Sequence, residues 1–190
     1  MTERLNPAEL EQELKAFKRD TSTDWYEWNI SDSVHEIGSG SDSIVFPYGK
    51  DKVVKIYKDG ISFLPQLMLY QEITNEGFKL CKKQNHSIQI YGRSFRVYVN
   101  PINFVYAFGQ SDTLCAISKR IPGERLFDSH LSDIHTIDQL CILDSRLDEK
   151  LGVKGISIID GNIKVVNPHT FPKLIITDLC SSINFLKKNK

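Results

Sequence analysis

Two features in the first third of the chain are suited to phosphate chemistry. Gly38 and Gly40 lie in a serine-rich turn that reads Gly-Ser-Gly-Ser-Asp-Ser, and Ser41 is part of that turn. Because glycine has no side chain, backbone N–H groups at such a turn can approach an anion closely. Lys55 follows in the apolar run Val-Val-Lys-Ile, where its ammonium can neutralise a phosphate oxygen. Together these residues predict a pocket that holds the phosphates of a nucleotide such as ATP.

Elements with regular periodicity must position these residues. Apolar residues recur at three- and four-residue spacing over residues 65–83 and 136–151, which predicts two amphipathic helices. The inner stripe of the first helix includes Tyr70, and that of the second includes Cys141. Short runs rich in β-branched and aromatic residues predict strands at residues 34–37, 43–47, 53–57, 88–101, 104–108, 114–118, 163–166 and 174–177.

The composition argues against several classes of protein. Lys+Arg and Asp+Glu are equal at 24 each, so the chain lacks the basic excess of a general nucleic-acid binder. No apolar run approaches the roughly 20 residues that a membrane-spanning helix needs, and no signal-peptide pattern follows Met1. The four cysteines form no CxxC pair, so they predict reduced thiols rather than a zinc site. These features predict a cytoplasmic protein without a membrane partner.

The order and spacing of the motifs resemble the protein-kinase-like superfamily over residues 33–183. The stretch EIGSGSDSIVF resembles the glycine-rich loop, with Ser43 where a third glycine usually lies, and VVKIYK resembles the strand with the phosphate-binding lysine. CAISKRIPGERL resembles the last strand of the small lobe and its hinge. The resemblance implies that the backbone from Lys119 to Ile121 bonds an adenine edge, with Ser118 at the gatekeeper position.

The resemblance also implies an α+β, two-lobed fold, with an antiparallel-sheet N-lobe that has one main helix and a truncated, mainly helical C-lobe. The expected divisions are an N-terminal helix and aromatic extension over residues 1–32, the N-lobe over residues 33–120 and a minimal C-lobe over residues 121–190. Within the extension, the helix is expected at residues 6–19.

The family pairs its strand lysine with a glutamate of the main helix. Glu76 is the first choice as the partner of Lys55. Glu72, one helical turn earlier, is the alternative.

The catalytic segment departs from the family pattern. GVKGISIIDGNI aligns with the catalytic loop, which puts Asn162 on the metal-binding asparagine but Ser157 on the catalytic aspartate. A neutral serine hydroxyl accepts no proton from a substrate at pH 7, and Asp160, three residues later, is the candidate to replace it. LIITDLCSSI resembles the segment with the second metal ligand, here Asp178. The resemblance therefore implies that Asn162 and Asp178 bind Mg²⁺.

Three functions stay open at this point. The loss of the catalytic base favours a pseudokinase, which would bind ATP and Mg²⁺ and have a regulatory or binding role. The alternatives are an active atypical phosphotransferase that acts on a protein or small molecule, and a scaffold domain that binds no nucleotide. The N-terminal extension and the aromatic-rich stretch over residues 88–104 are the expected surfaces for a protein partner.

Overall fold

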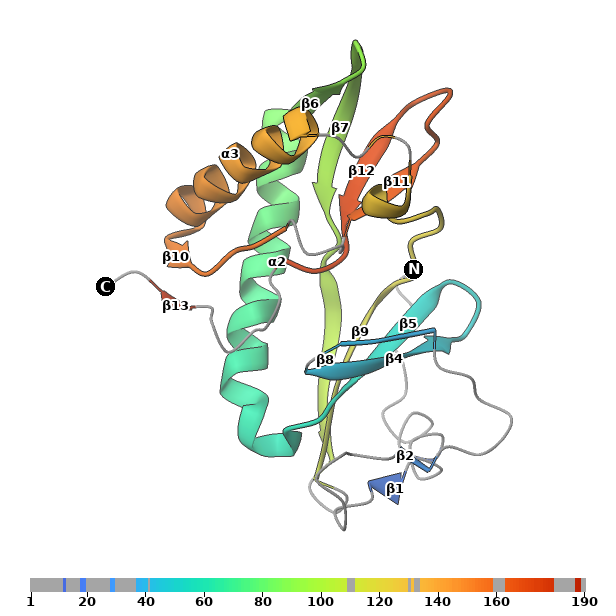
Figure 1. The fold of residues 1–190 in the computed structure, drawn as a ribbon. Coiled ribbons are helices and arrows are strands. Elements are labelled where there is room, and N and C mark those ends of the chain that lie inside the picture. Colours follow the sequence, from blue (N-terminus) through green and yellow to red (C-terminus); the bar gives the residue numbers. More distant parts are fainter. Residues whose placement is uncertain are drawn as a thin grey trace.

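The computed structural model describes residues 12, 18–19, 28–29, 37–40, 42–108, 112–129, 131, 134–158, 163–179 and 187–188. Over these residues the protein has an α+β fold, in which the long helices α2 and α3 lie against two larger sheets (Figure 1). Most of the extension expected over residues 1–32 lies outside the described residues. The helix expected over residues 6–19 does not reach its predicted end, because strand β1 (Lys18–Arg19) pairs there with β2 (Trp28–Asn29).

The first of the larger sheets is the predicted antiparallel sheet, and it contains the glycine turn and Lys55. Its strands in spatial order are β3 (Gly38–Ser39), β4 (Ser43–Tyr48), β5 (Lys52–Tyr57), β9 (Thr113–Lys119) and β8 (Ile102–Phe108). The β4–β5 hairpin turns at Gly49, whose φ of 56° suits glycine. In β9 every residue except the last is buried, because the strand lies between β5 and β8 and faces packed side chains on both sides.

Helix α2 (Leu64–Gln84), which follows the short helix η1 (Gly60–Phe63), is the main helix that the sequence predicts. Pro65 lies in its first turn, where a missing N–H costs no hydrogen bond, and Asn85 ends it in a left-handed conformation. Its buried residues recur at three- and four-residue spacing and are Leu67, Tyr70, Ile73, Thr74, Gly77 and Cys81. This stripe packs against β7 and β8, so α2 runs along both larger sheets (Figure 1).

The second of the larger sheets joins segments that the sequence assigned to different lobes. Its strands in spatial order are β11 (Ile163–Val166), β12 (Lys173–Ile176), β7 (Arg93–Val99) and β6 (Ser87–Ile90). Strand β12 runs parallel to β7, whereas the other neighbours are antiparallel. Tyr91 and Gly92, both at positive φ, form the tight turn between β6 and β7. After β7 the chain passes through Asn100 and Pro101 directly into β8, so it leaves one sheet and enters the other.

The stretch over residues 88–104, expected to be a partner surface, is mostly part of the core. The apolar side chains that alternate along β6, β7 and the start of β8 are buried, namely Ile88, Ile90, Phe95, Val97, Val99 and Ile102. Tyr91 at the hairpin turn is 64% exposed. A partner surface in this stretch therefore stays a proposal for the hairpin turn and the outward-facing side chains.

Helix α3 (Ile134–Leu151) is the main helix of residues 121–190 and follows the short helix η2 (Leu126–Asp128). Its buried stripe, Thr136, Leu140, Leu143 and Leu147, packs towards β6 and α2. Cys141 is predicted to face inward but is exposed, because the buried face around Leu140 and Leu147 is completed by Thr136 and Leu143 instead. Gly152, at a φ of 62°, ends the helix and leads into β10 (Val153–Lys154), which pairs with β13 (Lys187–Lys188).

A single hydrophobic cluster joins the two larger sheets and the two helices. It includes Tyr70 of α2, Val97 of β7, Leu114 of β9, Leu140 of α3 and Ile176 of β12. Within the described part of the chain, neither α2 nor α3 combines the length and apolar character that crossing a bilayer requires.

Gly123 is the position where we expect the backbone to tolerate no side chain. A Cβ at Gly123 would lie 2.0 Å from the carbonyl oxygen of Val165, and the φ of 105° disfavours any other residue. Gly123→Ala should therefore lower the free energy of unfolding by about 2 kcal/mol in a urea titration.

Gly38→Ala is the matched control for this prediction. At Gly38 nothing lies within 4 Å of an added Cβ, so its free energy of unfolding should change by less than about 1 kcal/mol. Equal stability of the two variants would contradict the contact at Gly123.

Candidate functional site

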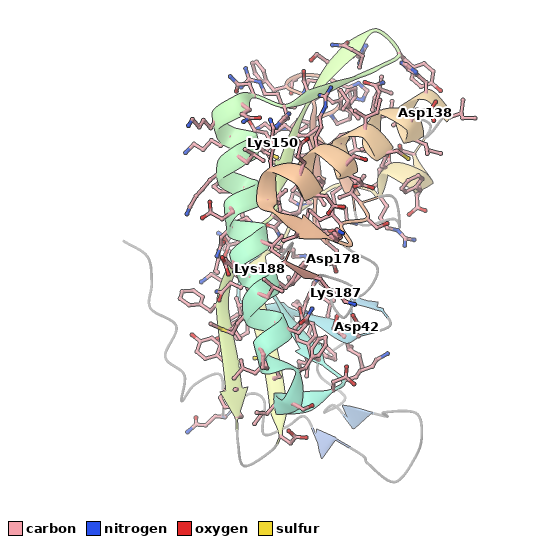
Figure 2. All side chains as sticks on the ribbon, turned by 90° about the vertical axis from the view of Figure 1, so that its left-hand side faces the viewer. Asp42, Asp138, Lys150, Asp178, Lys187 and Lys188 are labelled. Carbon is pink, nitrogen blue, oxygen red and sulfur yellow. The ribbon has the colours of Figure 1, made fainter. Side chains whose placement is uncertain are left out.

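The structure brings Lys55 and Asp178 into direct contact, although 123 residues separate them. Lys55 extends from β5, and Asp178 follows the end of β12. The Nζ atom of Lys55 lies 2.5 Å from Oδ2 of Asp178, and the two side chains are only 14% and 25% exposed. Figure 2 labels Asp178 near the centre of the molecule, with Asp42 of the glycine turn below it. This partly buried ion pair is the centre of the candidate site.

Tyr70 of α2 completes this centre and was missed as a site residue. Its hydroxyl donates a hydrogen bond to Oδ1 of Asp178 and accepts one, of 3.0 Å, from the backbone N–H of Leu179. The side chain is 2% exposed. A signal was present in the sequence, since Tyr70 lies in the predicted inner stripe of its helix and a buried tyrosine hydroxyl needs a polar partner.

Neither predicted helix glutamate reaches Lys55. Glu76 is exposed and pairs with Lys79 at 2.6 Å, and Glu72 is exposed and pairs with Lys188 at 2.9 Å. The reason is the rotation of the helix, because a residue six positions after Tyr70 lies about 240° around the axis from it. The prediction that Glu76, or else Glu72, pairs with Lys55 is therefore wrong for this structure.

The glycine turn lies at the edge of the first sheet, next to β5. The N–H of Gly40 bonds the carbonyl of Ser43 at 2.9 Å, and the Nζ of Lys58 bonds the carbonyl of Gly40 at 2.8 Å. Neither Gly38 nor Gly40 has a positive φ, and nothing lies within 4 Å of a Cβ added at either position. Packing among the described residues thus does not require glycine here, whereas the close approach of a ligand to the backbone would. Ser41 lies outside the described residues.

The predicted hinge, Lys119 to Ile121, begins at the end of β9. Asn100 links it by hydrogen bonds to β12, the strand that precedes Asp178. Asn100, which is 8% exposed, donates from Nδ2 to the carbonyl of Lys119 at 3.0 Å, and its backbone N–H bonds the carbonyl of Ile176 at 2.8 Å. The N–H of Arg120 is taken by the carbonyl of Asp51. A carbonyl oxygen has two lone pairs, so that of Lys119 can accept a second hydrogen bond, and no described group bonds the N–H of Ile121.

The segment around Ser157 lies beside the Asp178 turn. The backbone N–H of Ser157 bonds the carbonyl of Leu179 at 2.8 Å. Two carboxylates of α3 hold its neighbours, because Asp148 accepts from the N–H of Ile156 and Asp144 accepts from the N–H of Ile158, each at 3.1 Å. The segment with Ser157 thus lies next to Asp178 and Leu179, whereas Asp160 and Asn162 lie outside the described residues.

The described residues fit a magnesium ion better than a metal that needs a protein cage. Mg²⁺ commonly uses one or two carboxylates together with phosphate oxygens and water, and Asp178 offers one such carboxylate beside Lys55. Among the described residues no cluster of three His, Cys, Asp or Glu side chains could hold a metal. Burial raises the pKa of Cys81 to about 11 and that of Cys115 to about 12, so neither is a thiolate at neutral pH.

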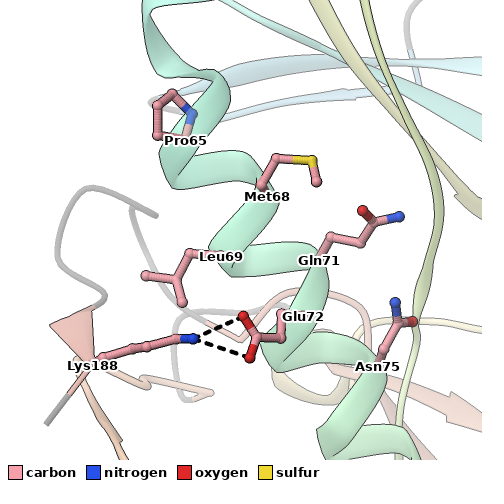
Figure 3. A pocket seen from close by; sticks show the side chains of 7 residues that line it. All are labelled: Pro65, Met68, Leu69, Gln71, Glu72, Asn75 and Lys188. Carbon is pink, nitrogen blue, oxygen red and sulfur yellow. Dashed lines mark hydrogen bonds and ion pairs between the residues drawn. The ribbon is translucent and has the colours of Figure 1, made fainter.

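A hollow of about 520 Å³ lies elsewhere, at the N-terminal half of α2 (Figure 3). Its lining residues are Pro65, Met68, Leu69, Gln71, Glu72, Asn75 and Lys188. Figure 3 shows the ion pair between Glu72 and Lys188 at one side of it. It contains neither Lys55 nor Asp178, so it is distinct from the candidate site.

No family model and no curated protein matches the sequence. Among solved structures, the fold is similar to the ternary complex of streptomycin, ATP and APH(2")-IIa. That match has a sequence identity of 20% and a TM-score of 0.36, and it covers 78% of this chain and 40% of that chain. A likeness of this size assigns no function, so the chemistry must be argued from the residues of this chain.

We expect the Lys55–Asp178 pair to show strong energetic coupling. Breaking a largely buried ion pair leaves one charge without its partner, so Lys55→Met and Asp178→Asn should destabilise less in combination than the sum of the single changes. The coupling energy should be about 1–2 kcal/mol in a double-mutant cycle measured by urea unfolding.

The matched control is the same cycle on Lys188→Met and Glu72→Gln. Both of these side chains are 58% exposed, so their coupling should stay below about 0.5 kcal/mol. Equal coupling in the two cycles would contradict the burial of the central pair.

Proposed function

We propose that this protein binds ATP, or a closely related nucleotide, in a kinase-like site formed by the glycine turn, Lys55 and the hinge. The observation that carries the proposal is the contact of Lys55 with Asp178, because two motifs 123 positions apart meet on β5, the strand that pairs with the one following the glycine turn. Gly38 and Gly40 support it, since the protein's own packing does not need glycine at either position.

Each part of the nucleotide has a proposed partner in the chain. The phosphates lie against the turn of Gly38, Gly40 and Ser41 and are neutralised by Lys55. The adenine bonds the backbone of Lys119 and Ile121, one carbonyl and one N–H, which is a pattern that tolerates any side chain. Glu76 takes no part, because it is exposed and paired with Lys79.

The proposed site also takes Mg²⁺, with Asp178 and Asn162 as its protein ligands. The ion would neutralise the charge of the phosphates and bridge them to the protein. Asp178 supports this role because its carboxylate lies beside the lysine that the phosphates would contact.

We further propose that the protein is a pseudokinase with a regulatory or binding role. Ser157 has a neutral hydroxyl at the position where the resemblance places the catalytic aspartate. Its segment is held beside the Asp178 turn by backbone hydrogen bonds and by Asp144 and Asp148. The segment is thus fixed by hydrogen bonds, but Ser157 has no carboxylate that could accept the substrate's proton. The competing functions are an atypical phosphotransferase with Asp160 as its base, and a scaffold without nucleotide.

Nucleotide binding is testable by thermal shift and calorimetry. ATP at about 100 times its dissociation constant should stabilise the protein by about 2.7 kcal/mol. Lys55→Met should weaken ATP binding by about 10–100-fold, because a charge-assisted contact is lost. Gly38→Ala should weaken it by about tenfold, because a methyl group fills the space of the approaching phosphate.

Glu76→Gln is the control and should bind ATP as the wild type does. A wild type that shows no shift at millimolar ATP would overturn the proposed binding and favour the scaffold. An effect of Glu76→Gln as large as that of Lys55→Met would contradict the observed arrangement of α2.

Transfer of phosphate separates the pseudokinase from the phosphotransferase. We expect no transfer of the γ-phosphate from labelled ATP to the protein itself, to water or to generic protein substrates, because Ser157 cannot act as the base at pH 7. Robust transfer that is abolished by both Lys55→Met and Asp178→Asn would contradict this prediction. Loss of that activity in Asp160→Asn would then identify the base.

A further inference from the structure

The hydrogen bonds of Tyr70 define its role more closely than burial alone. A phenol has one hydrogen to donate, and its oxygen can also accept. The N–H of Leu179 can only donate, so Tyr70 accepts that bond, and its own hydrogen goes to Oδ1 of Asp178. The two carboxylate oxygens of Asp178 therefore have different partners, Tyr70 on one and Lys55 on the other.

This arrangement orients the carboxylate of Asp178 from two directions. Lys55 approaches from the first sheet, whereas Tyr70 approaches from α2, and each holds one oxygen. Tyr70 also accepts a hydrogen bond from the backbone N–H of Leu179. Leu179 is fully buried and immediately follows Asp178. One hydroxyl group thus contributes both to the orientation of the carboxylate and to the position of the turn that carries it.

The charge of the site follows from the same arrangement. A helix glutamate at this place would add a second carboxylate beside Asp178, and the two would compete for the single ammonium of Lys55. Tyr70 is a neutral donor instead, so Asp178 is the one carboxylate bonded to Lys55 among the described residues. A neutral hydrogen bond to a metal-binding carboxylate fixes its geometry without withdrawing its charge.

We propose that Tyr70 is a positioning residue, which sets the carboxylate of Asp178 for a magnesium–nucleotide complex and replaces the helix glutamate as the link between α2 and the site. The inference rests on the proposed nucleotide function. It predicts that Tyr70 acts on the metal-dependent part of binding, whereas Lys55 acts on the phosphates directly.

The experiment measures the affinity for ATP by calorimetry, once with EDTA and once with saturating Mg²⁺, in the full chain. The ratio of the two affinities is the magnesium effect. In Tyr70→Phe the affinity in EDTA should stay within about twofold of the wild type, and the magnesium effect should fall by about tenfold, the usual size for losing an outer partner of a metal ligand. Tyr91→Phe, which removes a hydroxyl from the exposed hairpin turn, should change neither value.

A double-mutant cycle with Asp178→Asn adds a second readout. If Tyr70 acts through Asp178, then Tyr70→Phe should have no further effect on the magnesium effect once Asp178 is replaced. Should Tyr70→Phe fail to fold, 4-aminophenylalanine introduced at position 70 keeps a donor at the same place, and its magnesium effect should lie within about threefold of the wild type.

The outcomes separate this inference from the function on which it rests. Wild-type binding of ATP in EDTA supports the proposed function by itself. If ATP binds but Tyr70→Phe weakens binding equally with and without Mg²⁺, or leaves the magnesium effect intact, then Tyr70 is merely structural and the inference is overturned. A 4-aminophenylalanine variant that folds but has no magnesium effect would overturn it as well. If wild type binds no ATP in either condition, both proposals fail.

Discussion

The contact between Lys55, Asp178 and Tyr70 is the constraint on which the rest of the structure depends. Three elements that are distant in sequence must meet at one carboxylate, with a cation on one oxygen and a phenol on the other. All three side chains are largely or fully buried, so their polar groups must find one another or lose much of their hydration energy. The first sheet, α2 and the end of β12 must therefore lie close enough for these three side chains to form hydrogen bonds.

Periodicity and local residue types predicted the elements of the fold well, because these depend on neighbours in the sequence. The helix expected over residues 65–83 corresponds to α2, the strand around Lys55 corresponds to β5, and the α+β class with an antiparallel sheet is confirmed. The parallel pairing of β7 with β12 was not predicted, since it joins residues more than 70 positions apart. No local pattern encodes such a pairing; it results from the burial of apolar faces that become neighbours only in the folded chain.

The candidate site, too, was predicted correctly in some features and wrongly in others. Motif order was sufficient to place Lys55 and Asp178 in one site, but it misassigned the helix residue that meets them. The family resemblance favours an acidic residue and hence Glu76, although the predicted inner stripe of the same helix contains Tyr70. The phase of a helix decides which side chain points inward, and residue type cannot override it without exposing the apolar face. Asn100 was missed for a different reason, because its side-chain amide donates to the carbonyl of Lys119 and its backbone N–H donates to the carbonyl of Ile176, two groups that only tertiary structure brings close.

The direct passage of the chain from β7 into β8 has a consequence for how ligands would enter and leave. Strand β7 is hydrogen-bonded to β12 in one sheet, strand β8 is hydrogen-bonded to β9 in the other, and α2 packs along both. Rotation of the two sheets relative to each other would have to bend the chain at Asn100 and Pro101 and slide α2 along at least one of the sheets. Access to Lys55 would then depend on local movement of the edge of the first sheet formed by β3 and β4, which has β5 as its one neighbouring strand among the described residues. If a nucleotide binds there, its release would require movement of this edge rather than the opening of two lobes, so its residence time would follow the stiffness of the edge.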